Sequence, residues 1–188
     1  MDALEAIRER RMLPRVREDR PSQDEIAELL ELAVRAPAHF RTEPWRFHVL
    51  AGEALDDLAQ AIADEQVDSA GADPDEALAE ARKKVSRAPV VVVVTCRPQL
   101  DKDGVVEQEE IVATAMALQN LLLGAYASGL GAMLRTGAAS YHPAARKRLG
   151  LDDDEIVIGM VYLGYPAADR EKTERAPASD KTRWLGWN

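Results

Sequence analysis

Disulfides, secretion signals and membrane spans are all missing from this sequence of 188 residues. It has one cysteine, Cys96, which excludes an intramolecular disulfide. The N-terminus lacks the charged start and apolar stretch of a signal peptide, and no uninterrupted apolar run reaches the roughly 18 residues that a membrane span needs. We therefore expect a cytoplasmic protein that does not enter a membrane.

The sequence also lacks a net positive charge, because its 33 acidic residues outnumber its 24 lysines and arginines. The formal net charge is −9 and the sequence pI is about 4.9. Binding to nucleic acid or to an anionic membrane requires a net attraction to phosphate, so both classes of partner are disfavoured. In contrast, 46% hydrophobic residues are enough to fill a core, and the length fits a single domain over residues 1–188.

Several catalytic and metal-binding patterns are absent. The sequence has no G-x-S-x-G motif, and Cys96 lies in an apolar segment that favours a neutral, buried thiol. His39, His48 and His142 form no H-E-x-x-H motif, and one cysteine cannot form a cysteine-pair zinc site. The acidic segment 152–155 lacks the spaced ligands and the glycine of a calcium loop. No metal site and no protein nucleophile are predicted.

The usual nucleotide-binding loops are missing as well. The segment 129–134 has two of the three glycines of the dinucleotide motif, and it follows a helical pattern instead of opening a helix. No P-loop sequence is present. Three unusual features remain: an arginine cluster near the N-terminus, a cationic loop between two prolines, and a glycine-rich turn after an apolar helix.

Hydrophobic periodicity predicts helices that alternate with strands. Ser22 and Glu25 form a capping box, and Val90–Cys96 is a β-branched run typical of a central strand buried on both faces. We expect helices over 2–11, 22–35, around 55–62, 74–84, 107–128 and 143–150, strands over 45–50, 90–96, within 129–137 and over 155–164, and a surface loop over 67–75. This order favours an α+β or α/β sandwich with one mixed sheet.

Two segments carry more apolar surface than one chain easily covers. The helix predicted over 107–128 is apolar nearly all round its middle, and such a helix must be covered. The charged tail 165–188 ends with Trp184 and Trp187, although indoles rarely face water. We favour a homodimer whose interface includes this helix, with the domain's own core as the alternative cover. The tail is expected to pack on the partner subunit.

A basic cluster lies near the N-terminus of this acidic protein. It consists of Arg8, Arg10, Arg11, Arg15, Arg17 and Arg20. Guanidinium groups bind phosphate oxygens through paired hydrogen bonds, so the cluster fits a phosphate site. A solvated helix end is the alternative interpretation.

The segment 35–47 joins a helix to a strand through a loop that is rigid and cationic. Pro37 ends the preceding helix, and Pro44 precedes the alternating pattern of a half-buried strand. Between the prolines lie His39 and Arg41. The residues alone allow two interpretations, a wall for an anionic or aromatic ligand and a stiff structural turn.

Five motifs, in this order and spacing, resemble the nitroreductase family, and most closely its compact bacterial members. The matching pieces are Asp2–Glu5 through Arg10 and Arg11, Arg35–His39 with Pro44 and Trp45, Glu107–Glu109, Gly129–Gly137, and Val161–Pro166. The resemblance spans nearly the whole chain. It implies a three-layer α/β/α sandwich built as an intertwined homodimer, with two FMN molecules at the subunit interface.

The resemblance also implies which residues bind FMN. These are Arg10, Arg11, Met12, Arg35, His39, Gly131, Ala132, Met133 and Arg135. Met12 replaces a family serine, and Leu134 stands where a tryptophan is frequent. Arg35 and His39 are expected to come from the other subunit, relative to the glycine-rich turn. No catalytic side chain is predicted, because the flavin carries the electron chemistry.

The activity implied is that of an FMN-dependent oxidoreductase with a ping-pong mechanism. Hydride passes from NADH or NADPH to the flavin, and a nitroaromatic, quinone or similar small acceptor is then reduced in the same pocket. Two alternatives stay open. One is a flavin enzyme of the same fold with different redox chemistry on a specific metabolite, and the other is a flavin-binding dimer without turnover.

Overall fold

A computed structural model describes residues 2–137, 141, 143–168 and 174–187. Its elements are α1 (Ala3–Glu9), α2 (Gln23–Ala33), η1 (His39–Arg41), β1 (Trp45–Ala51), α3 (Glu53–Ala70), α4 (Pro74–Val85), β2 (Val90–Cys96), α5 (Glu107–Ala127), β3 (Gly131–Arg135), α7 (Pro143–Arg148), β4 (Ile156–Gly164) and η2 (Ala178–Lys181). The helices and strands follow one another as the sequence predicts.

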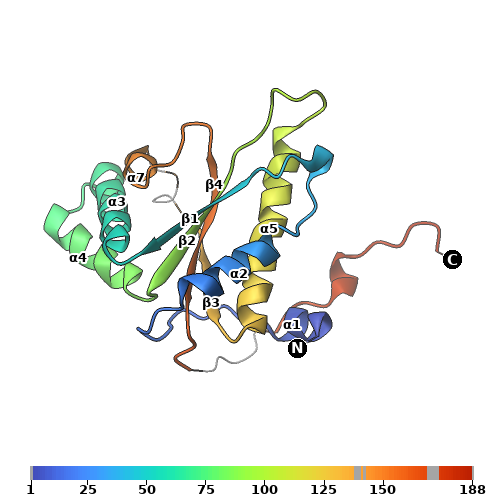
Figure 1. Cartoon of the computed structure of the whole chain (residues 1–188), viewed down its shortest axis with the longest axis horizontal. Helices are drawn as coiled ribbons and strands as arrows, with labels where there is room; N and C mark the ends of the chain where they lie inside the picture. The colour runs from blue at the N-terminus through green and yellow to red at the C-terminus, as the bar shows by residue number, and fades with distance from the viewer. Residues whose placement is uncertain (1, 138–140, 142, 169–173, 188) are drawn as a thin grey trace.

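The strands form one sheet in the order β1-β2-β4-β3, with every neighbouring pair antiparallel (Figure 1). A mixed sheet was expected. Among the described residues, the parallel pairing is confined to one bridge between Met12 and Ala132. The parallel part of the sheet therefore comes from the segment after α1 and not from one of the four strands.

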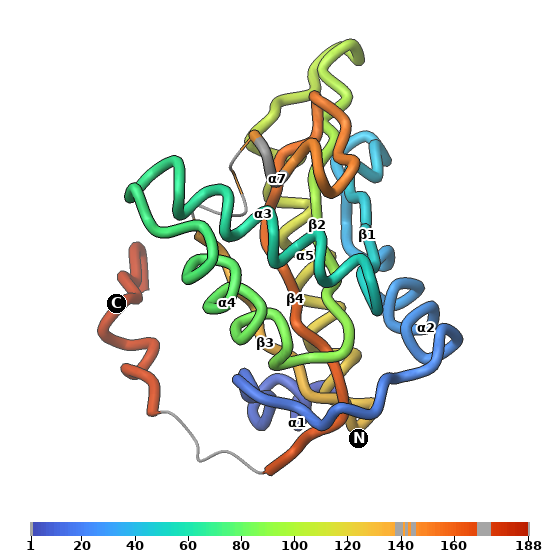
Figure 2. Tube along the Cα trace, turned by 90° about the vertical axis from the view of Figure 1, so that its left-hand side faces the viewer, coloured from blue at the N-terminus to red at the C-terminus, as the bar shows by residue number. Residues whose placement is uncertain are grey.

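Helices cover both faces of this sheet, which confirms the three-layer α/β/α sandwich. The helices α3 and α4 lie on one face, and α2 and α5 lie on the other (Figures 1 and 2). All seven residues of β2 are buried. Val91 and Val93 join the core under α3 and α4, whereas Val92 and Val94 join the core under α2 and α5. Because both faces are covered, a continuous valine run replaces the usual alternation.

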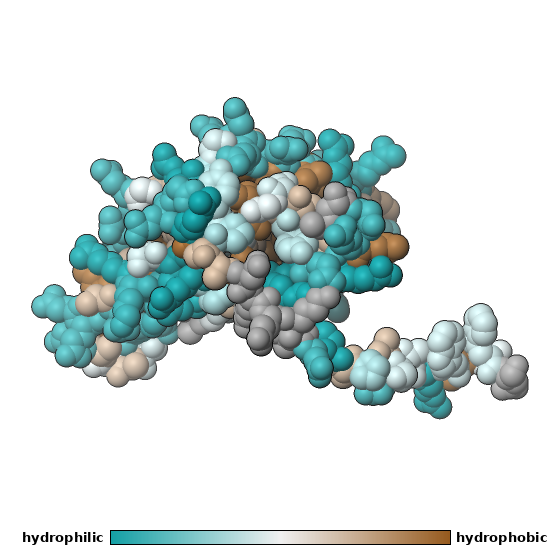
Figure 3. Space-filling model, turned by 90° about the horizontal axis from the view of Figure 1, so that it is seen from below, coloured by the Kyte–Doolittle hydropathy of each residue, from teal (hydrophilic) through white to brown (hydrophobic). Residues whose placement is uncertain are grey.

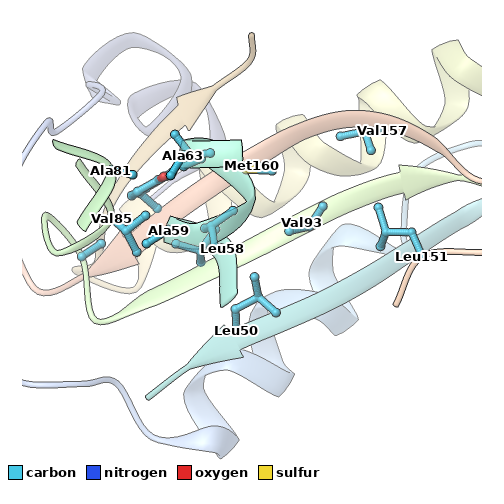
Figure 4. Close-up of a cluster of buried hydrophobic side chains, with 14 of the residues drawn as sticks. Leu50, Leu58, Ala59, Ala63, Ala81, Val85, Val93, Leu151, Val157 and Met160 are labelled. Atoms are coloured by element: carbon cyan, nitrogen blue, oxygen red, sulfur yellow. The ribbon is translucent and has the colours of Figure 1, made fainter. Parts of the chain in front are cut away.

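The core under α3 and α4 combines strand side chains such as Leu50, Val93 and Met160 with leucine, valine and alanine side chains of the two helices (Figure 4). Ala59 and Ala63 on α3 and Ala81 on α4 are almost fully buried, so the two helices pack closely. Leu58 is also fully buried. Burial of such a leucine side chain contributes about 1.5–3 kcal/mol to folding.

The loop predicted over 67–75 is wrong for its first four residues. Helix α3 continues to Ala70 and ends at Gly71, whose φ of 63° is the left-handed conformation that glycine adopts without strain. Asp73 then caps α4 by accepting hydrogen bonds from the backbone N–H groups of Asp75 and Glu76. Val67 packs against the core, so tertiary burial overrides the polar composition of this segment.

Several large apolar side chains are exposed on the single chain. Leu4 and Ile7 of α1 are about 60% exposed, and Val112 of α5 is 50% exposed. Trp184 and Trp187 stack edge to face on a tail that projects from the body (Figure 3). The domain core therefore covers only part of α5, and the two indoles of the tail are exposed on the single chain.

Helix α5 is long and apolar enough to cross a membrane by length and composition alone. Half of its most apolar window is buried in this fold. It packs against the sheet and against α2, which is the arrangement of a core helix.

Candidate functional site

The segment that follows α1 is fixed against β3, and this pairing brings the N-terminal arginines to the glycine-rich turn. Leu13 donates its backbone N–H to the carbonyl of Ala132 at 2.9 Å. The backbone N–H of Leu134 donates to the Met12 sulfur at 3.4 Å. Arg10 and Arg11 precede this pairing directly, so they lie beside the part of β3 that contains Met133.

Gly131 and Ala132 are buried, and Ala132 pairs with the N-terminal segment through its backbone carbonyl. A Cβ atom on Gly131 would lie 2.8 Å from the Leu13 side chain and 3.0 Å from that of Val16. The glycine is therefore required for close packing of the N-terminal segment against β3. In the single chain, Gly131 and Ala132 do not line the hollow described next but hold the N-terminal segment against β3.

The pairing forms a hollow of about 420 Å³, here called the arginine hollow. It is lined by Ile7, Arg8, Arg10, Arg11, Met12, Met133 and Arg175. Five of the predicted site residues, Arg10, Arg11, Met12, Met133 and Arg135, thus come together here or directly beside it. Arg175 is a lining residue that the sequence did not reveal, because it belongs to the distant C-terminal tail.

Three arginines at this site have buried nitrogens without a hydrogen-bond partner among the described residues. They are Nη1 of Arg10, Nε of Arg11 and Nε of Arg135. Burial lowers the pKa of Arg10, and the charges of Arg175 and Arg11 lower it further. Buried donors are normally satisfied, and clustered positive charges favour an anion. A phosphate group would supply both the acceptors and the charge.

The guanidinium of Arg11 also has a structural role at the end of α1. Its Nη1 donates to the carbonyls of Arg8, Glu9 and Arg10, at 3.1, 2.5 and 3.0 Å. Its Nη2 forms an ion pair with Glu9 at 3.2 Å. The last carbonyls of a helix lack partners within the helix, so Arg11 stabilises this end of α1 while its Nε stays available.

Arg135 lies over an aromatic ring on the neighbouring strand. Its guanidinium carbon is 5.2 Å from the centroid of the Tyr162 ring, which is a cation–π contact. Burial raises the pKa of Tyr162, and the charges of Arg135 and Arg87 oppose that rise. The tyrosine ring therefore holds the Arg135 side chain in place without using its Nε donor.

His39 belongs to a second hollow, of about 580 Å³, here called the His39 hollow. Pro37, Ala38, His39, Val106, Gln108, Glu109, Val112, Ala113 and Met116 line it. His39 Nε2 is 3.9 Å from Glu109 Oε2, and both side chains are more than half exposed. One wall is the proline-bounded loop and the other is the first half of α5.

Arg35 lies outside both hollows. Its side chain is 76% exposed and forms an ion pair with Glu31, one turn earlier on α2, at 3.7 Å. In the single chain it is therefore part of a solvated helix end.

The two hollows lie at opposite ends of α5. The arginine hollow includes α1, which contacts the last part of α5, whereas η1 lies beside its first turns (Figure 1). A helix of 21 residues is roughly 30 Å long. Within one chain, His39 and the arginines therefore cannot contact the same small ligand.

Two buried carboxylates were missed by the sequence interpretation. Glu110 accepts from Thr42 and Gln99, while Glu155 contacts His48 and Thr95. Glu110 has acidic neighbours at the start of α5, and Glu155 ends an acidic run, so both resemble solvated charges in the sequence. Their burial depends on segments that are far away along the chain.

No set of three histidine, cysteine or acidic side chains within the described ranges could hold a metal ion. The expected absence of a protein nucleophile concerns the reaction and stays a prediction. Cys96 is buried, and burial is the main cause that raises its thiol pKa.

The fold and the site define a class of protein: a three-layer α/β/α sandwich whose N-terminal arginines and β3 line one hollow. The chain belongs to the nitroreductase family, whose family model matches residues 7–165.

Two curated relatives agree with this membership. The chain is 31% identical to the Escherichia coli K12 protein named "Putative NAD(P)H nitroreductase YdjA", with 88% of this chain and 89% of that protein covered. It is 28% identical to a protein of Thermus thermophilus named NADH dehydrogenase, with 98% and 96% covered.

Solved structures share the fold. A nitroreductase-like family protein from Bacillus cereus has a TM-score of 0.85 at 24% identity, over 99% of this chain and 97% of that chain. The FMN- and NADPH-dependent nitroreductase NfnB, from a Sphigopyxis strain, has a TM-score of 0.81 at 21% identity over the full length of both chains. At such identities the likeness concerns the fold alone.

Proposed function

We propose that this protein is an FMN-dependent oxidoreductase that takes a hydride from NADH or NADPH and passes reducing equivalents to a nitroaromatic, quinone or similar small acceptor. The observation that carries the proposal is the arginine hollow, where buried nitrogens of Arg10 and Arg11, and of Arg135 on the neighbouring part of β3, have no acceptor among the described residues. The names of the relatives and of NfnB support the same chemistry.

The residues of the arginine hollow fit the phosphate end of FMN. Arg10 and Arg11 would bind the phosphate oxygens, and Arg135 would add a third donor from β3. Met12 and Met133 line the same hollow and offer apolar surface. FMN, when bound, supplies the hydride-accepting chemistry, and the protein provides binding, orientation and exclusion of water.

The distance between the two hollows supports a homodimer with the cofactor between the subunits. The His39 hollow of one subunit would then face the arginine hollow of its partner. Exposed apolar side chains at both places, Ile7 on α1 and Val112 and Met116 on α5, favour such an association. Arg35 and the indoles of the tail, all exposed in the single chain, are expected to contact the partner.

The proposed compartment is the cytoplasm, where thiols such as that of Cys96 stay reduced. Neither nucleic acid nor a membrane is proposed as a partner, because the net charge of −9 disfavours both.

Anaerobic flavin reduction tests the proposal. The protein, reconstituted with FMN, is mixed with NADH or with NADPH, and bleaching of the flavin absorbance is followed. A panel of nitroaromatics and quinones is then added, and initial rates at varied donor and acceptor concentrations should give the parallel lines of a ping-pong mechanism.

Each negative result has a defined meaning. A protein that stays colourless after reconstitution would overturn the proposal. A flavin that neither nicotinamide reduces would favour different redox chemistry on the same fold. A flavin that is reduced but never reoxidised by the panel would favour the binding dimer without turnover.

A further inference from the structure

We propose that Thr42 and Glu110 form a latch that holds the loop 38–44 in the shape in which it contacts the cofactor. Both are then positioning residues of the site, although neither lines the His39 hollow. This inference rests on the FMN site proposed above. We call the contact between these two side chains the Thr42–Glu110 latch.

The loop has an unfavourable backbone conformation that other contacts must maintain. Phe40, Arg41 and Glu43 have φ angles of 51°, 54° and 48°, in the left-handed region that non-glycine residues rarely adopt. Such conformations persist only where the surroundings enforce them, and they cluster at ligand sites. His39 directly precedes these residues, and its side chain lines the His39 hollow close to Glu109.

The latch is buried behind this loop. Thr42 is 3% exposed and Glu110 is 1% exposed. The Thr42 hydroxyl donates to Glu110 Oε1 at 2.6 Å, and the backbone N–H of Gln99 donates to Glu110 Oε2 at 3.2 Å. The Gln99 side chain also donates to the Thr42 carbonyl at 2.5 Å. The carboxylate therefore ties the loop to α5 and to the segment after β2.

Successive residues of α5 contact the loop from two sides. Glu109 lines the hollow and lies 3.9 Å from His39, whereas Glu110 points into the interior and bonds Thr42. The first turn of a helix favours negative charge, because the N–H groups there lack acceptors within the helix. Glu110 lies in this first turn, and its two carboxylate oxygens accept from the Thr42 hydroxyl and from the Gln99 backbone N–H.

The protein has a matched control for this contact on the other face of the sheet. The Thr95 hydroxyl donates to the Glu155 carboxylate, and both residues are buried. Neither residue lines either hollow. Thr42→Val and Thr95→Val therefore remove the same kind of hydrogen bond, one beside the site and one away from it.

The experiment compares FMN dissociation constants, measured by quenching of flavin fluorescence, with thermal midpoints and amide hydrogen exchange. For Thr42→Val we expect up to about a tenfold weaker affinity for FMN, the size of one lost hydrogen bond, and faster exchange of the amides in 38–44. Thr42→Ser keeps the hydroxyl and should bind as the wild type does. Thr95→Val should lower the thermal midpoint and leave FMN affinity unchanged.

The latch is overturned if Thr42→Val lowers the thermal midpoint as Thr95→Val does but binds FMN like the wild type. Should Thr42→Val fail to fold, Glu110→Leu decides by the same measurements, because a leucine side chain accepts neither from the Thr42 hydroxyl nor from the Gln99 N–H. Unchanged affinity and exchange in that variant also overturn the latch. A wild-type protein that binds no FMN overturns the proposed function and this inference together.

Discussion

Arg10 and Arg11 are neighbours in the sequence but have different surroundings. Arg11 Nη1 donates to the carbonyls at the end of α1, while Nη1 of Arg10 is buried and has no hydrogen-bond partner among the described residues. The same residue type therefore caps a helix at one position, while at both positions it offers a buried nitrogen to the proposed phosphate. This difference gives the two substitutions distinguishable consequences.

Replacement of either arginine by alanine should weaken FMN binding. Each lost hydrogen bond to a charged group costs about 1.5–3 kcal/mol, which is roughly a 10- to 150-fold rise in the dissociation constant. Arg11→Ala should also lower the thermal midpoint, because α1 loses its C-terminal cap, whereas Arg10→Ala should not. Fluorescence titration and thermal unfolding measure the two effects.

Arg82→Ala is the control for these variants. Arg82 lies on α4, is 61% exposed and forms only a surface ion pair with Asp56. Its removal should change neither FMN affinity nor the thermal midpoint appreciably. Titration curves for Arg10→Ala that superimpose on those of Arg82→Ala would reject the phosphate role of Arg10.

Glu155 gives a second prediction at the residue scale, on stability against pH. Burial raises the pKa of Glu155, but hydrogen bonds from Thr95 and His48, together with the charge of His48, bring that pKa below its usual 4.5. A carboxyl group whose pKa is lower in the folded state stabilises the fold above its unfolded pKa. That contribution is lost as pH falls below 4.5 and through the folded pKa.

Urea unfolding at several pH values measures this effect. The free energy of unfolding should fall less between about pH 5 and pH 3 in Glu155→Gln than in the wild type, because the substituted side chain cannot be protonated. Glu80→Gln, at an exposed site on α4, should keep the wild-type slope. Equal slopes in all three proteins would show that Glu155 has the same pKa folded and unfolded.

How far the residues could be predicted depends on where their partners lie. The sequence marked Arg10, Arg11 and Arg135 as phosphate ligands, and the structure places them at or beside one hollow. It could not identify Glu110 as a buried acceptor, because Thr42 and Gln99 reach it only through the fold. Arg175 was missed for the same reason.

At the scale of elements, α5 connects the whole site. Its first half lines the His39 hollow, its last turns lie beside α1, and its buried face packs on the sheet. The predicted bounds of 107–128 agree with the observed Glu107–Ala127. The apolar pattern on all sides predicted a cover beyond the domain core, and the exposure of Val112 and Met116 shows which face lacks one.

Val112→Lys should therefore weaken the proposed dimer. Burial of a valine side chain contributes about 1.5–3 kcal/mol, and a lysine adds the cost of desolvating a charge, so we expect at least about a tenfold rise in the dimer dissociation constant. Sedimentation velocity over a range of concentrations measures it. Ala79→Lys, at an exposed position of α4, controls for the one added positive charge. Unchanged association in Val112→Lys would exclude this face from the interface.

Two element-scale expectations needed revision for physical reasons. The polar segment 67–70 is helical because Val67 can bury itself against the core. The parallel pairing expected in the sheet is limited to the Met12 bridge, because the four strands all run antiparallel to their neighbours. Periodicity predicts an element, but strand direction depends on where the connections place it.

At the scale of the whole molecule, the single chain holds two separate hollows and a tail with exposed indoles. The hollows are separated by the length of α5, and residues 174–187 project from the body (Figure 1). None of the three clusters of buried hydrophobic side chains includes a residue of 174–187. The rest of the chain should therefore fold without the tail, while the proposed dimer should be less stable without it.

Truncation after residue 173 tests this division. The shortened protein should keep the circular dichroism spectrum of the full chain, because both cores remain, but it should dissociate at higher concentrations and bind FMN more weakly, because it loses Trp184, Trp187 and Arg175. Sedimentation and FMN titration measure both losses. A double substitution of the two tryptophans by alanine separates packing of the tail from the charge of Arg175.

The truncated protein could also remain a full dimer with wild-type FMN affinity. That result would reject a role for the tail at the interface and leave α5 as its main candidate.

The sequence by itself determined the elements, the family and most of the arginine hollow, because helix periodicity, β-branched runs and short motifs are local properties of the chain. Only the tertiary structure decided that Arg35 is solvated in the single chain, that Gly131 serves close packing, and that His39 and the arginines lie at opposite ends of α5. These outcomes depend on which distant segments share a surface, and buried carboxylates such as Glu110 acquire their partners only when the chain has folded.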